Sequence, residues 1–152
     1  MSVPIASYGA SIVLRRRGIV VCVVVLLSVA GCLWRGYATI LGVHLDVLTQ
    51  TAAKLVNVVE SGRGPTAEGM AEYVYPAQRA REFMRQFSSY GERASYRQLG
   101  VLLDRYEAIV KGVDAARVTG GQTKPDVTAL AAERDKLEQL AVSIRIDAAA
   151  GQ

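Results

Sequence analysis

A chain of 152 residues is long enough for one domain and an anchoring segment, and its 51% hydrophobic content excludes a disordered tail or linker. Arg15, Arg16 and Arg17 carry three of the charges behind the net +4, while residues from 33 onward hold 15 Lys and Arg against 14 Asp and Glu. A nucleic-acid-binding domain needs its excess positive charge where it meets the phosphates, so we expect no nucleic-acid partner.

Residues 18–37 predict a single transmembrane signal anchor. From Gly18 to Trp34 the chain has 17 residues without a charge, which span roughly 25 Å as a helix. Trp34 and Tyr37 lie where an aromatic belt at the membrane interface is expected. The arginines before the span place the segment 1–17 in the cytoplasm and the C-terminal domain in the periplasm of a bacterial inner membrane.

The end of the apolar run suggests an alternative. Val29-Ala30-Gly31-Cys32 resembles the lipobox at which bacterial lipoprotein signal peptides are cleaved. In this alternative, Cys32 is acylated and becomes the first residue of a mature lipoprotein. Lipoproteins often continue with a polar tether, whereas the residues after Cys32 run straight into helical periodicity. We therefore favour the uncleaved anchor and retain the lipoprotein as the alternative.

The number and position of the cysteines and of the histidine limit which disulfides and metal sites the domain can contain. Cys22 and Cys32 both lie in the apolar run, so the domain beyond has neither an internal disulfide nor a cysteine-based metal site. The single histidine, His44, cannot assemble a multi-histidine zinc site. We interpret His44 as a packed or interfacial imidazole, with a single axial ligand to a haem or chlorin magnesium as the alternative. No metal and no cofactor is predicted.

The periodicity after residue 33 is helical throughout, which predicts an all-α fold. The first seam advances in alternating steps of four and three residues: Trp34, Ala38, Leu41, Leu45, Leu48, Ala52, Leu55 and Val59. It predicts one helix that continues from the anchor, from about Gly18 to Glu60, and ends at the Gly- and Pro-containing stretch 61–65. We expect Leu45, Leu48 and Leu55 to be buried against the other helices of the bundle or against a partner helix.

Further amphipathic segments follow. Thr66 is the predicted N-cap of the second one, with Glu68 in its first turn, and Pro76 is expected to kink or restart it. A break is predicted at 88–91, a loop at 119–122, and Pro125 in the first turn of the last helix. The apolar stripes contain Ala80, Phe83, Met84, Phe87 and Tyr90; Tyr96, Leu99, Leu103, Tyr106, Val110 and Val113; and Val127, Leu130, Leu137, Leu140 and Ile144. Together they predict an extramembrane antiparallel helical bundle over residues 38–149, with 150–152 as a tail.

Residues 73–97 are the candidate partner-binding segment. They contain six of the ten aromatic residues and five arginines against two glutamates. Aromatic residues and arginine are enriched where proteins meet proteins. The candidate contact residues are Tyr73, Tyr75, Arg79, Arg81, Arg85, Tyr90, Arg93 and Arg97. The competing interpretation is that the aromatics are bundle core and the arginines a solvated face.

No catalytic residues, phosphate-binding loop or small-molecule substrate are predicted from the sequence. The predicted function is therefore a non-catalytic accessory or structural subunit of a bacterial membrane protein complex. Its expected partners are integral membrane protein subunits and the lipid bilayer. Energy-transducing assemblies, respiratory or photosynthetic, are the class in which such subunits are common. The alternative is a lipoprotein that acts as a periplasmic binding or envelope-structure module.

Overall fold

The computed structural model describes residues 36–62, 64–119 and 125–150. The chain divides into two compact units, Met1–Gly36 and Tyr37–Gln152, and the described residues belong almost entirely to the second. Cys32 and nearly all of the predicted anchor therefore lie outside the described residues. Within the described part, no helix has both the length and the apolar character needed to cross a membrane.

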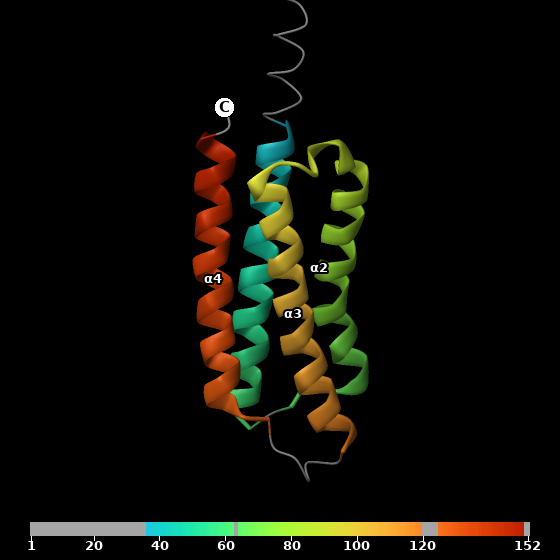
Figure 1. Cartoon of the computed structure of the whole chain (residues 1–152). Helices are drawn as coiled ribbons and strands as arrows, with labels where there is room; N and C mark the ends of the chain where they lie inside the picture. Colours follow the sequence, from blue (N-terminus) through green and yellow to red (C-terminus); the bar gives the residue numbers. More distant parts are fainter. Residues whose placement is uncertain (1–35, 63, 120–124, 151–152) are drawn as a thin grey trace, which may run out of the picture. The chain divides into compact units, whose positions relative to one another are not determined.

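The second unit is a bundle of four helices. The first runs over residues 36–60 and is called helix 36–60 below. It is followed by α2 (Ala67–Gln86), the short 3-10 helix η1 (Ser88–Tyr90), α3 (Ala94–Val118) and α4 (Val127–Ala150). Consecutive helices run in opposite directions, with α4 and α2 on either side of helix 36–60 and α3 (Figure 1). The described residues contain helices and turns only, which confirms the predicted all-α class and the helical bundle.

The ends of the helices follow local chemistry, mostly as predicted. Helix 36–60 ends where Gly62 adopts a left-handed backbone (φ 72°), a conformation that costs glycine little. The Thr66 side chain accepts a hydrogen bond from the Gly69 amide at 3.1 Å, which confirms it as the N-cap of α2. The predicted break at 88–91 is also confirmed, because η1 separates α2 from α3.

Pro76 lies inside α2, which continues through it without a restart, so of the two expected effects only a kink is left. The expectation about the other proline needs correction. Pro125 lies before α4 and not in its first turn. Asp126 makes the capping contact, since its Oδ1 accepts a hydrogen bond from the Ala129 amide at 3.0 Å. An aspartate directly before a helix satisfies the free amides of the first turn, so Asp126 was the better start signal.

The core lies along the inner face of helix 36–60. Leu45, Leu48 and Leu55 are each 0% exposed, as predicted from the seam. Burying a leucine side chain stabilises a fold by roughly 1.5–3 kcal/mol. The other predicted stripes also supply buried residues, but further buried residues lie outside them, among them Leu102, Ile109, Ala141 and Ala148. Helix α3 contacts both α2 and α4, so its buried face is wider than one stripe.

Tyr37, which was predicted to lie in an aromatic belt at the membrane interface, is buried against other helices of the bundle. Its ring is 0% exposed and stacks on Tyr90 with a centroid separation of 4.5 Å. Phe83 and Phe87 approach the same ring to 5.5 and 5.6 Å. Tyr37 precedes Leu41 by one helical turn and so shares its inward-facing side. The sequence did not predict this burial of Tyr37; its place relative to a membrane stays a prediction, and Trp34 lies outside the described residues.

Candidate partner-binding face

Several of the arginines predicted to meet a partner are already paired within the bundle. Arg81 donates from Nε to Glu107 at 2.6 Å and from Nη2 to Asp104 at 3.0 Å. These hydrogen bonds, the one to Glu107 first, raise the pKa of Arg81. The contacts join α2 to α3, so the position of Arg81 is explained by the bundle itself.

The arginines near the end of α2 also have local partners. Arg85 forms an ion pair with Glu82, and Arg97 donates to the Glu92 carbonyl at 2.6 Å. The Arg93 guanidinium lies 5.4 Å from the centre of the Tyr90 ring, in the range of a cation–π contact.

The aromatic residues of the segment divide between core and surface. Tyr73 is 4% exposed, and its carbonyl accepts a hydrogen bond from the Tyr106 hydroxyl at 2.5 Å. Tyr90 is partly covered by Tyr37. Tyr75 is 59% exposed. The interpretation as bundle core therefore fits Tyr73 and Tyr90, whereas Tyr75 is available to a partner.

Tyr75 and Arg79 form a pair on the side of α2 that faces helix 36–60. The Arg79 guanidinium lies 6.0 Å from the centre of the Tyr75 ring. His44 packs against Phe83 of α2 at 4.9 Å between ring centres. Partial burial, and secondarily the charge of Arg79, lower the pKa of His44. Arg79 therefore lies near the border between the two helices, and His44 is the packed imidazole that we expected.

Helix 36–60 carries a second apolar row that the sequence interpretation missed. Ile40, Val43 and Val47 are 41%, 57% and 41% exposed. Their spacing of three and four residues puts them on one face of the helix. Ile40 and Val47 are four and three residues from His44, so the row borders the side that meets α2. The signal was present in the sequence, because the row repeats with the same period as the buried seam.

We call these five residues the outer face: Ile40, Val43, Val47, Tyr75 and Arg79. Past the far end of the row, Lys54 of helix 36–60 and Glu72 of α2 form an ion pair at 2.5 Å. The outer face thus has an apolar row, one exposed aromatic ring and one guanidinium group. This mixture is typical of protein interfaces, in which aliphatic and aromatic side chains form the centre and arginine provides directional hydrogen bonds.

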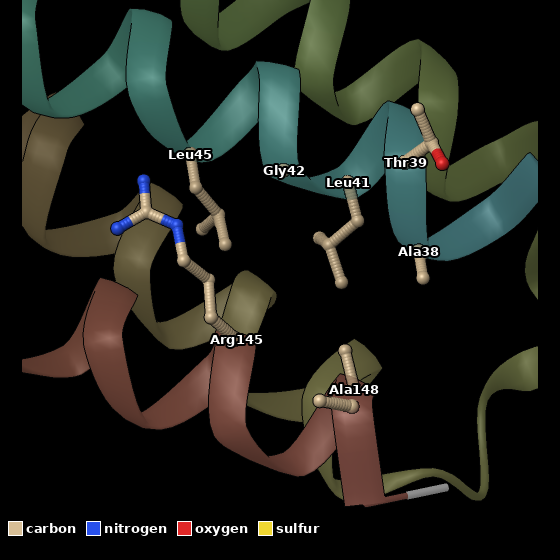
Figure 2. Close-up of a pocket in the computed structure, with 8 residues that line it drawn as sticks. Ala38, Thr39, Leu41, Gly42, Leu45, Arg145 and Ala148 are labelled. Atoms are coloured by element: carbon tan, nitrogen blue, oxygen red, sulfur yellow. The ribbon is translucent and has the colours of Figure 1, made fainter. Parts of the chain in front are cut away.

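Two hollows between the described helices are candidate ligand sites. A groove of about 280 Å³ lies between helix 36–60 and α4 and is lined by small side chains such as Ala38, Gly42 and Ala148. Figure 2 shows Leu41 and Leu45 directed toward this groove and Arg145 reaching across it from α4. Arg145 is held in an ion pair with Asp46.

A second hollow, of about 260 Å³, lies between α2 and α3 over Tyr73 and Tyr106. The Arg81–Glu107 pair stands among its lining residues. Within the described ranges, no group of three or more His, Cys, Asp or Glu side chains could hold a metal ion. Lys111 also lines this second hollow and forms an ion pair with Glu107 at 3.8 Å, so these charged groups already have partners within the bundle.

Comparison with known proteins adds no relative: no family model matches the sequence, and no curated protein or solved structure matches it significantly. A function for the chain is therefore argued from its own surface. The outer face is one part of that surface, and it combines an exposed apolar row with an exposed aromatic ring and a guanidinium group. It retains two residues of the predicted contact segment, Tyr75 and Arg79, and adds three from helix 36–60.

Proposed function

We propose that the chain is a non-catalytic accessory subunit of a bacterial membrane protein complex. In this proposal residues 18–37 anchor it in the inner membrane, and the periplasmic bundle binds integral membrane subunits through the outer face. The observation that carries the proposal is the exposed row Ile40, Val43 and Val47. The opposite face of the same helix supplies the core, so folding does not need a second apolar row.

The position of the row along the chain supports a membrane partner. Ile40 follows the end of the predicted anchor by three residues. A partner whose own transmembrane helix extends beyond the bilayer could lay that helix along Ile40, Val43 and Val47. Helices pack in this way when apolar residues recur at steps of three and four. Tyr75 and Arg79 at the edge would give specificity, with Arg79 available to a carboxylate of the partner.

A paired substitution tests this proposal. Val43→Gln combined with Val47→Gln removes the apolar row, and glutamine is a good helix former, so the bundle should keep its melting temperature. We expect the amount of co-purified partner in mild detergent to fall by about tenfold or more, as for central interface residues. The matched control is Val142→Gln with Ile146→Gln on α4, where both side chains are also exposed. Wild-type stoichiometry in the first variant would contradict the proposal.

The lipobox-like sequence before Cys32 supports the lipoprotein as a second candidate. The intact mass of the purified protein separates the two. The anchored subunit keeps residues 1–31, and Cys32→Ala leaves it in the membrane. A chain that lacks residues 1–31 and carries added acyl mass would establish the lipoprotein instead, with a role as a periplasmic binding or envelope-structure module.

A further inference from the structure

The turn between α2 and α3 lies at the end of the bundle where helix 36–60 begins (Figure 1). The rings of Tyr37 and Tyr90 stack 4.5 Å apart and so hold this turn next to the start of helix 36–60. Tyr37 is the first residue of the compact unit, so the predicted anchor joins the bundle at the same end. We call residues 85–97 the α2–α3 corner. The described residues of the other two connections, 61–62 and 64–66, and 119 and 125–126, lie at the opposite end.

The α2–α3 corner is more basic than the segments that lead to the other two connections. Within residues 85–97 there are three arginines, Arg85, Arg93 and Arg97, against one acidic residue, Glu92. In the sequence, residues 60–68 and 114–126 together hold four acidic residues against three basic ones. The basic corner therefore lies at the end of the bundle where the chain enters it from the predicted anchor.

The polar groups of the corner can exchange their present partners. The side chains of Arg85 and Arg97 are 77% and 61% exposed in their ion pairs. Exposed ion pairs of this kind contribute little stability, so phosphate oxygens could replace the carboxylates. Ser88 and Ser89 add exposed hydroxyl groups. In residues 85–97 no large hydrophobic side chain is strongly exposed.

We propose that the α2–α3 corner binds the anionic phosphate headgroups of the membrane in which the chain is anchored. This inference rests on the anchor of the proposed function but concerns a different surface from the outer face. Clustered basic side chains next to a membrane are attracted to anionic lipids over about one Debye length, roughly 8–10 Å. A protein partner would need an apolar centre, which the corner lacks and the outer face has. Contact with headgroups would also hold the bundle in one orientation and present the outer face to neighbouring subunits.

The test uses the full chain with Cys22→Ser and Cys32→Ala, reconstituted into vesicles of phosphatidylcholine and phosphatidylglycerol. A fluorophore is attached at Ser89→Cys in the corner or, as a control, at Ser61→Cys at the opposite end. Both positions are exposed. Lipids with a quencher on the headgroup report the approach of each fluorophore to the membrane surface. We expect the label at position 89 to be quenched at least about twofold more than the label at position 61.

The electrostatic basis of the contact is tested by removing charge from the lipids or from the arginines of the corner. The excess quenching at position 89 should vanish in pure phosphatidylcholine and at about 1 M salt, where the Debye length falls to about 3 Å. It should also vanish with Arg85→Gln and Arg97→Gln. The matched pair Lys111→Gln and Lys136→Gln, which lies away from the corner, should retain it. Excess quenching at position 89 that does not change with lipid charge, salt concentration or the two arginine substitutions would overturn the proposal.

The remaining outcomes separate this inference from the function proposed above. A chain that stays anchored but shows equal quenching at positions 89 and 61 overturns the headgroup contact alone. A chain that alkali extracts from the vesicles overturns the anchor and the headgroup contact together. If position 89 responds only when the co-purified partner is added, the corner binds an acidic protein and the lipid assignment is wrong.

Discussion

The two faces of helix 36–60 have similar apolar residues in opposite environments. The inner face places Tyr37, Leu45 and Leu48 where they are 0% exposed, against side chains of the other helices. The outer face leaves Ile40, Val43 and Val47 at least 41% exposed on the same helix. Both rows have helical spacing, so periodicity alone does not tell them apart. The packing of the bundle does: the inner row explains stability, and the outer row requires another explanation.

The largest expected effect is on the inner face. Leu48→Ala should lower the free energy of unfolding by about 2–5 kcal/mol, because it removes buried methyl groups and leaves a cavity. Val43→Ala on the outer face should change it by less than about 0.5 kcal/mol. Chemical denaturation followed by circular dichroism measures both variants. Similar losses in the two would show that the outer row is part of the core, and the comparison would fail.

Two tyrosines extend the comparison to other helices. The Tyr106 hydroxyl is buried and donates to the Tyr73 carbonyl, and burial raises the pKa of Tyr106 above its usual value. Tyr106→Phe should therefore cost about 1 kcal/mol of stability, the usual net value of such a hydrogen bond. Tyr75→Phe removes an exposed hydroxyl and should leave the melting temperature unchanged. An unchanged melting temperature in Tyr106→Phe would show that its hydrogen bond contributes nothing net.

His44 lies at the border of the two faces, and its effect should be smaller still. Burial and the charge of Arg79 lower its pKa in the folded state, so the folded protein takes up this proton less readily than the unfolded chain. Stability from this group is complete above about pH 6.5 and is lost as the pH falls through the lower folded-state pKa. Because His44 is the only histidine, His44→Gln should reduce the decline in melting temperature between about pH 7.5 and pH 5.5. An identical decline in the variant would exclude His44 as its cause.

The sequence predicted features that depend on neighbours along the chain. The seam of Leu45, Leu48 and Leu55 and the cap at Thr66 follow from helical spacing and local hydrogen bonding, and both are confirmed. Arg81 was assigned to a partner surface because its carboxylate partners, Asp104 and Glu107, lie 23 and 26 residues away in the chain. Their proximity depends on how α2 and α3 pack, which a single sequence does not reveal.

The candidate site was predicted in part for the same reason. Tyr75 and Arg79 were among the predicted contact residues, but the exposure of Ile40, Val43 and Val47 depends on which side of helix 36–60 meets the bundle. Tyr37 was assigned to the membrane interface because it follows an apolar run. Its burial became visible only with the helix in register against Phe83 and Tyr90. Whether the predicted contact residues meet a partner remains a prediction.

Cysteine accessibility tests the central claim, that the outer face is covered by a partner. Val43→Cys and Ile146→Cys are introduced separately into the chain with Cys22→Ser and Cys32→Ala, and both are labelled with a hydrophilic maleimide. The Arg145–Asp46 ion pair places the two positions at a similar level of the bundle, so coverage by lipid would affect both. We predict that native membranes protect position 43 and leave position 146 reactive, whereas the purified chain reacts at both. Equal labelling of position 43 in native membranes and in the purified chain would contradict the account.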